Sequence, residues 1–139
     1  MIKIAKDIFE NKNEIFTSVI TLTEVLPAKL TDDQEEKFHG TFKSSNHILY
    51  DVDYAIAKKT RELRNQFLNH QSGKILSTPD SLHLATAIIY SADELNTFDD
   101  GKKDKRFLGL LELSGTSEVG GLIIKKPLID PSFGLAIDS

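Results

Sequence analysis

The stretch "ILSTPDSLHLATAIIY", residues 75–90, predicts a short apolar run that turns directly into a core helix. Thr78 is the expected N-cap and Pro79 the first helical residue, which is a favoured arrangement. Asp80 then falls on the first turn of that helix. It has two interpretations: it is a good helix starter, or it is one of several carboxylates that hold a divalent metal at one edge of a sheet.

Upstream of this stretch the sequence alternates between helix and strand patterns. Apolar residues at helical spacing predict a helix over residues 2–10, and "EIFTSVIT" predicts a buried strand over 15–20. Thr21 and Glu24 form a capping box, so a helix is expected to begin at about Thr21, and Pro27 should end or kink it early. Thr31 and Gln34 repeat the same start signal.

The remaining elements continue the alternation. A very short strand is expected at 48–50, followed by a helix capped by Asp51, and Gly73 ends that region. The expected buried stripe of this helix is Val52, Ala55, Ile56, Leu63 and Phe67. Strands are also expected at 95–98 and 121–125, the second ended by Pro127. Alternating strands and helices predict an α/β fold with a parallel sheet flanked by helices.

Length and composition set broad bounds on the protein. At 139 residues we expect one domain over 1–139, with 128–139 as a possible tail. The chain has no cysteine, which excludes disulfides, thiolate zinc sites and cysteine nucleophiles. No membrane helix or signal peptide is expected, which fits a cytoplasmic protein.

The charges are unevenly distributed. A net charge of −4 argues against a broad basic surface that binds nucleic acid through charge alone. Basic residues nevertheless cluster at 58–64 and 102–106, and acidic residues at 32–36 and 93–104. An acidic centre flanked by basic stretches suits a metal-dependent enzyme acting on phosphates, and an ordinary solvated surface equally well.

Three acidic positions share one topological feature, because each follows a predicted strand or apolar run. Glu24 follows the strand 15–20, Asp80 follows Ile75 and Leu76, and Asp99, with Asp100 beside it, follows the strand 95–98. In a parallel sheet these strand ends lie at one edge, where ligands bind. Carboxylates gathered there need a cation, and Mg²⁺ or Mn²⁺ fits oxygen ligands. Such a site can activate water and stabilise a phosphodiester transition state.

Each acid also has a structural interpretation. Glu24 completes a capping box, Asp80 favours the positive end of a helix dipole, and Asp99–Asp100 before Gly101 form a common turn. His83 lies three residues after Asp80, on the same helix face. It is either a ligand or proton carrier, or a partly buried histidine that hydrogen-bonds to a neighbour.

With these residues in place, the sequence resembles the PIN-domain family, especially VapC-type toxins of bacterial toxin–antitoxin pairs. The matching segments are "SVITLTEVL" with Glu24, "VDYAIAKKTRELR", "STPDSLHLATAI" with Asp80 and His83, and "ADELNTFDDG" with Asp99, over about residues 15 to 125. The resemblance implies a Mg²⁺- or Mn²⁺-dependent ribonuclease acting on RNA. Glu24, Asp80 and Asp99 would ligate the metal directly or through water, with Asp100 as an outer helper. It also implies a homodimer and a small antitoxin that occludes the site.

The start of the chain departs from this family pattern. PIN domains open with a central strand that ends in Asp-Thr-Asn or similar, whereas this sequence is expected to begin on the tail of the second helix, so the sheet should be incomplete at the N-terminus. Three explanations are open: a truncated product, a degenerate inactive member, or replacement of the strand by another segment. Leu135, Ala136 and Ile137, followed by Asp138 and Ser139, resemble the missing pattern. That segment would enter antiparallel or by swapping into a partner chain, or it is a disordered tail.

Two other function classes remain as alternatives. The first is a catalytically inactive PIN-like scaffold that acts as a binding or interaction module. The second is a generic α/β phosphatase or receiver domain, whose usual aspartate after the first strand is equally missing here.

Overall fold

Strands and helices follow one another largely in the predicted order. The computed structural model describes residues 15–24, 30–41, 43 and 47–127. The elements are β1 (Ile15–Ser18), α2 (Thr21–Glu24), α3 (Asp32–Thr41), β2 (His47–Tyr50), α4 (Tyr54–Gln66), α5 (Thr78–Ile89), β3 (Glu94–Asn96) and β4 (Ile123–Lys125), with short 3₁₀ helices η1 (Leu110–Leu113) and η2 (Ser117–Val119) before β4. The expected helix at 2–10, the break at Pro27 and the segment 128–139 lie outside the described residues.

The strands pair in parallel, as the α/β prediction requires. β1 pairs with β2 from Ile15 opposite His47 to Ser18 opposite Tyr50. β3 pairs with β4 from Glu94 opposite Ile123 to Asn96 opposite Lys125. β1, β3 and β4 are shorter than their apolar patterns suggested, whereas β2 begins one residue earlier than expected. Ile75 forms only an isolated bridge to Phe107. The predicted fold class is therefore confirmed.

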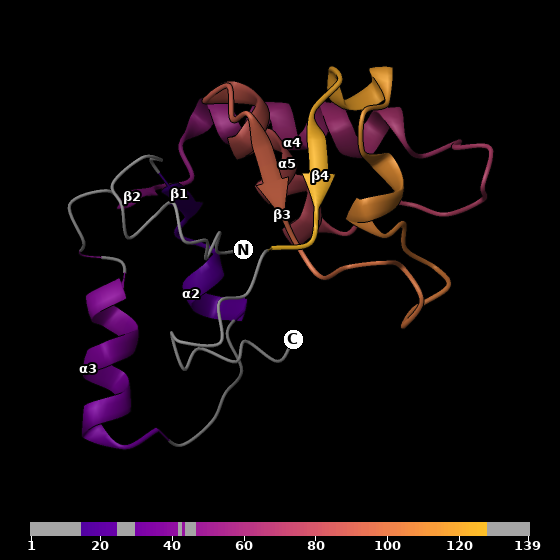
Figure 1. Cartoon of the computed structure of the whole chain (residues 1–139). Coiled ribbons are helices and arrows are strands. Elements are labelled where there is room, and N and C mark those ends of the chain that lie inside the picture. Colours follow the sequence, from indigo (N-terminus) through magenta and orange to yellow (C-terminus); the bar gives the residue numbers. More distant parts are fainter. Residues whose placement is uncertain (1–14, 25–29, 42, 44–46, 128–139) are drawn as a thin grey trace.

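The strands form two separate two-stranded sheets, with β1 and β2 to one side of β3 and β4 (Figure 1). Helix α5 packs against both β1 and β3. Between these two strands lies a groove of about 420 Å³. It is lined by Ile15–Ser18, by Glu94–Asn96, by His83, Thr86 and Ala87 of α5, and by Tyr90 directly after that helix. Within the described residues no strand lies between β1 and β3. The gap between the two sheets agrees with the expectation that a central strand of the family's sheet is missing from the described residues.

Two helix starts differ from the prediction by one or two residues. Asp53, and not Asp51, caps α4: its Oδ1 accepts a hydrogen bond of 2.9 Å from the backbone N of Ile56. Ser77, and not Thr78, caps α5, so Pro79 is the second helical residue. Serine and aspartate are both favoured N-cap residues, so Asp53, two residues after Asp51, and Ser77, one residue before Thr78, can take this role. The start signal at Thr31 is confirmed, because Thr31 and Gln34 exchange reciprocal side-chain hydrogen bonds.

The core lies between α4 and α5 and extends over β3 and β4. Because α4 begins at Tyr54, its buried stripe is Ile56, Thr60, Leu63 and, just after the helix, Phe67. Val52 precedes the helix and is 38% exposed, and Ala55 is also exposed, so these two positions of the predicted stripe were wrong. The stripe packs into a cluster that includes Leu84, Leu110, Val119 and Ile124.

Phe67→Ala tests this core, because Phe67 is fully buried whereas its neighbour Leu68 is 61% exposed. We expect Phe67→Ala to lower the free energy of unfolding by about 3–5 kcal/mol, measured by urea denaturation. Leu68→Ala should change it by less than about 0.5 kcal/mol, and Phe67→Leu should fall between the two. Equal losses for the two alanine variants would contradict the packing described.

Candidate active site

Asp80 and Asp99 line one small pocket from two different elements. Asp80 stands on the first turn of α5, where its backbone N donates to the Ser77 Oγ at 3.3 Å. Asp99 stands in the loop after β3. The pocket has a volume of about 210 Å³ and is lined by Ser77, Asp80, Asp99, Gly101, Lys103, Asp104, Phe107 and Leu108. The structure thus brings together two of the predicted site residues.

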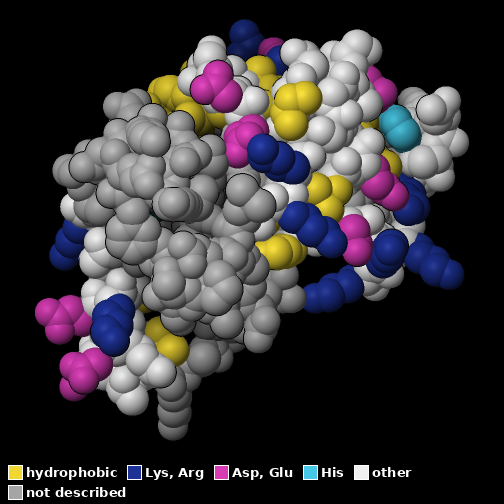
Figure 2. All heavy atoms as spheres, in the orientation of Figure 1, with side chains coloured by type: hydrophobic (Ala, Val, Ile, Leu, Met, Phe, Trp, Pro, Cys, Tyr) yellow, Lys and Arg dark blue, Asp and Glu magenta, His cyan; other side chains and the backbone are white. Residues whose placement is uncertain are grey.

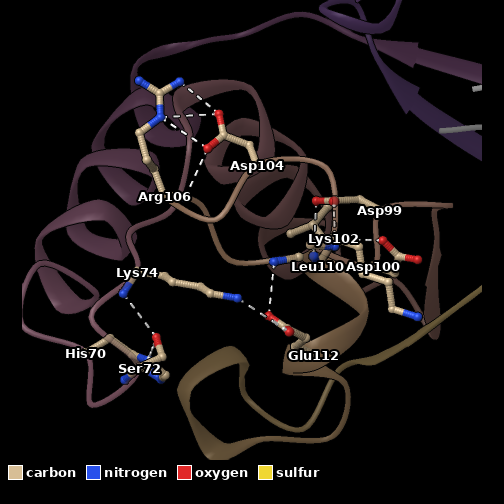
Figure 3. Close-up of polar contacts among 12 residues, drawn as sticks. His70, Ser72, Lys74, Asp99, Asp100, Lys102, Asp104, Arg106, Leu110 and Glu112 are labelled. Carbon is tan, nitrogen blue, oxygen red and sulfur yellow. Dashed lines mark hydrogen bonds and ion pairs between the residues drawn. The ribbon is translucent and has the colours of Figure 1, made fainter.

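Asp99 is held in place by its own loop. Its Oδ1 accepts from the backbone N of Gly101 at 3.1 Å, and its Oδ2 accepts from the backbone N of Leu110 at 3.2 Å (Figure 3). The loop can close in this way because Gly101 and Gly109 meet without side chains. A Cβ on Gly101 would lie 2.7 Å from the Gly109 N, and Gly101 has a φ of 77°. The glycines therefore fix the orientation of the Asp99 carboxylate.

The environment of Asp80 disfavours its negative charge. Burial raises the pKa of Asp80 to about 7, helped by the charge of Asp99, by a hydrogen bond to Asp99 and by the charge of Glu24, while a hydrogen bond from Ser77 opposes the rise. Two neighbouring carboxylates repel each other when both are ionised. A proton or a bound cation relieves that repulsion, so this pair fits a cation-binding site.

Glu24 reaches the neighbourhood from α2, but its carboxylate is engaged elsewhere. His83 Nε2 and Glu24 Oε1 form a short contact. The hydrogen bond from His83 lowers the pKa of Glu24, against the opposing effect of burial. His83 is only 5% exposed, so the interpretation of a partly buried histidine bonded to a neighbour is confirmed. The neighbour is Glu24, 59 residues away in the sequence.

Asp100 faces away from the pocket. Its Oδ1 accepts from the backbone N of Lys102 at 3.0 Å, and Figure 3 shows its carboxylate pointing in a different direction from that of Asp99. That hydrogen bond, together with the charges of Lys102 and Lys126, lowers the pKa of Asp100. Asp100 therefore interacts with two lysines and does not line the pocket.

The four predicted acids thus fall into a facing pair, a histidine-bonded acid and an outward-facing acid. Asp80 and Asp99 offer carboxylate oxygens of the kind that Mg²⁺ and Mn²⁺ bind. In the described part of the chain, however, no three His, Cys, Asp or Glu side chains are grouped closely enough to hold a metal ion. The pair therefore offers part of a metal site, and Glu24 lies outside it, bonded to His83.

Sequence reasoning missed three contributors to this site. Ser77 orients the first turn of α5, Lys103 brings a cation to the pocket, and the backbone N–H of Leu110 binds Asp99. Of these, only Ser77 carried a local signal, because it is a favoured N-cap residue three positions before Asp80.

The raised pKa of Asp80 predicts how the free energy of unfolding depends on pH. Its folded pKa of about 7 lies above the value of about 4 expected in the unfolded chain. The folded state therefore holds the proton more tightly, and the stabilisation is complete below pH 4 and lost as pH rises through 7. We expect Asp80→Asn to remove this fall, a difference of about 1–3 kcal/mol in metal-free protein after solvent screening.

The measurement is urea denaturation of both proteins between pH 4 and pH 8 in EDTA. Asp33→Asn, at an exposed position of α3 outside the pocket, should keep the wild-type profile. Parallel curves for the wild type and Asp80→Asn would contradict the unfavourable pairing of Asp80 with Asp99.

Comparison with known proteins identifies the family. The sequence profile of the PIN domain matches residues 2–108, which is more than half of the chain. No match was found among curated proteins or among solved structures. None of the helices in the described ranges has the length and apolar character needed to span a bilayer. This match, over most of the chain, shows that the chain belongs to the PIN domain family.

Proposed function

We propose that this chain is a Mg²⁺- or Mn²⁺-dependent ribonuclease of the VapC toxin type, which cleaves RNA phosphodiesters. PIN domains are a nuclease-type fold, generally dependent on divalent metals and acting on RNA. The observation that supports the proposal most strongly is the pair formed by Asp80 and Asp99, in which burial and mutual repulsion raise the pKa of Asp80 to about 7. An arrangement that disfavours two negative charges is expected where a cation compensates them.

In the proposed mechanism Asp80 and Asp99 hold the ion, directly or through water, and Glu24 and Asp100 are further candidate ligands. When bound, the ion supplies a water of lowered pKa and positive charge for the phosphodiester transition state. Asp80 must give up its proton for the ion to bind. The backbone N–H groups of Gly101 and Leu110 keep Asp99 oriented while this happens.

The VapC-type resemblance extends the proposal to partners. A small antitoxin would inhibit the enzyme by covering the pocket of Asp80 and Asp99, and the active form would be a homodimer. Support for these partners comes from the four sequence segments that resemble VapC-type toxins.

A catalytically inactive PIN-like scaffold is the second candidate. The contact between Glu24 and His83 favours it, since it keeps a third carboxylate from the Asp80–Asp99 pair. Such a protein would act as a binding module and would gain little from a divalent metal.

A metal titration separates the two candidates. If the pair binds Mn²⁺, a concentration of 100 times the Kd stabilises the folded protein by about 2.7 kcal/mol and raises Tm by several degrees, measured by differential scanning fluorimetry. Asp80→Asn should lose this rise, and cleavage of a labelled single-stranded RNA should fall by about 10²-fold or more. Asp33→Asn should match the wild type in both assays.

Each result decides a different point. RNA cleavage by Asp80→Asn at the wild-type rate would remove Asp80 from the site. A wild-type protein whose Tm does not respond to Mn²⁺ or Mg²⁺, and that does not cleave RNA, would support the scaffold.

A further inference from the structure

We propose that Lys102, Lys105 and Lys126 bind the backbone phosphates of RNA and guide the strand across the acidic pocket. We call these three residues the lysine cluster. This inference deepens the proposed function and rests on it, because it assigns the surface that receives the substrate.

The lysine cluster is assembled next to the acidic pair by two elements. Lys102 and Lys105 belong to the loop that begins at Asp99 and returns at Leu110, where the hydrogen bond to the Asp99 carboxylate closes it. Lys126 follows β4, and the backbone O of Lys125 accepts from the backbone N of Thr97, two residues before Asp99. The end of β4 is thereby fixed beside the start of the loop.

The two parts meet at the start of the loop. The backbone N of Lys102 donates to the Asp100 Oδ1 at 3.0 Å, and Asn96 of β3 lies opposite Lys125 in the parallel pairing with β4. Lys103 of the same loop lines the pocket together with Asp80 and Asp99. Figure 2 shows Lys and Arg side chains gathered on this part of the visible face, interspersed with acidic groups.

The basic neighbours of the lysine cluster form ion pairs, whereas its three members form none with the described residues. Arg106 is paired with Asp104 at 2.8 Å, Lys125 with Glu94 at 2.8 Å and Lys74 with Glu112 at 4.0 Å. Lys102, Lys105 and Lys126 are exposed, and no carboxylate of the described residues lies within ion-pair distance of them. Their charges are therefore available to an external anion.

The lysine cluster offsets a negative charge that would otherwise repel RNA. The chain carries a net charge of −4, and three aspartates, Asp80, Asp99 and Asp104, line the pocket, so a polyanion is repelled by the molecule as a whole. Cations placed at the rim of the pocket are what would bring a phosphodiester to it. Lysine binds phosphate as a point charge and suits contacts that do not depend on base sequence.

Helix α4 provides a matched control. Lys58, Arg61 and Arg64 are also three exposed cations without a carboxylate partner among the described residues. In Figure 1, α4 crosses the top of the view, whereas the loop after β3 lies at the lower right. Neutralising either set removes the same net charge. A difference in RNA affinity between the two variants therefore reflects where the charges lie on the surface.

The experiment measures RNA binding without cleavage. A labelled single-stranded 12-nucleotide RNA is titrated by fluorescence anisotropy in EDTA against three proteins that carry Asp80→Asn: the otherwise unchanged chain, Lys102→Gln/Lys105→Gln/Lys126→Gln, and Lys58→Gln/Arg61→Gln/Arg64→Gln. Circular dichroism checks that all three are folded. We expect the lysine-cluster variant to bind at least ~10-fold more weakly and its salt slope to shrink by about 2. The α4 variant should stay within about 2-fold of the parent.

The outcomes separate this inference from the proposed function. Unchanged RNA affinity in the lysine-cluster variant, equal losses in both variants, or no RNA binding by the parent each overturn the inference. RNA cleavage by the wild type can persist in the first two cases. Lysine-dependent RNA binding by a chain that never cleaves RNA upholds the surface and overturns the nuclease. If labelled oligoglutamate binds as tightly with the same lysine dependence, the surface serves an acidic protein and the inference is overturned.

Discussion

The repulsion between Asp80 and Asp99 is the constraint on which the candidate site depends. The two carboxylates line a partly buried pocket of about 210 Å³, and the pKa of Asp80 rises to about 7 as a result. Folding places these charges together at a cost in free energy, since each would be better solvated in the unfolded chain. A cost of this kind is typical of a site whose occupant compensates it. Either a metal ion or a proton would compensate the cost by neutralising part of the negative charge.

The surrounding elements hold Asp80 and Asp99 together from both sides. On one side Ser77 caps α5 and thereby fixes the first turn that carries Asp80. On the other, Gly101 and Gly109 approach so closely that the loop folds back and places the N–H of Leu110 on Asp99. Substituting either glycine would displace this loop, and with it both the Asp99 carboxylate and the lysines that follow. The candidate metal ligand Asp99 and two of the three lysines proposed to bind RNA thus belong to one loop.

Local signals in the sequence predicted most of the fold. Alternating apolar runs predicted all four strands and their parallel class, and start signals located α3 to α5 within two or three residues. The errors in the helix starts were also local. The predicted caps were Asp51 and Thr78, whereas the structure uses Asp53, two residues later, and Ser77, one residue earlier. The strand ends also indicated that Asp80 and Asp99 would meet, because parallel strands end at one edge.

The sequence did not predict the tertiary contacts of the acidic side chains. The partner of His83 lies 59 residues upstream, and no local pattern reveals that Glu24 is bonded to it. Nor does a pattern show that Asp99 and Asp100, adjacent in sequence, face different surroundings. These contacts decide how many acidic side chains lie close enough together to share one ion.

The most direct test of the central claim is the titration of the aspartate carboxyl carbons by ¹³C NMR, with and without Mg²⁺. In metal-free protein we expect one resonance, absent from Asp80→Asn, to titrate near the value of about 7 that the structure gives. Saturating Mg²⁺ should move that midpoint to lower pH, since the ion competes with the proton. An Asp80 that titrates near pH 4 and does not respond to Mg²⁺ would contradict the account.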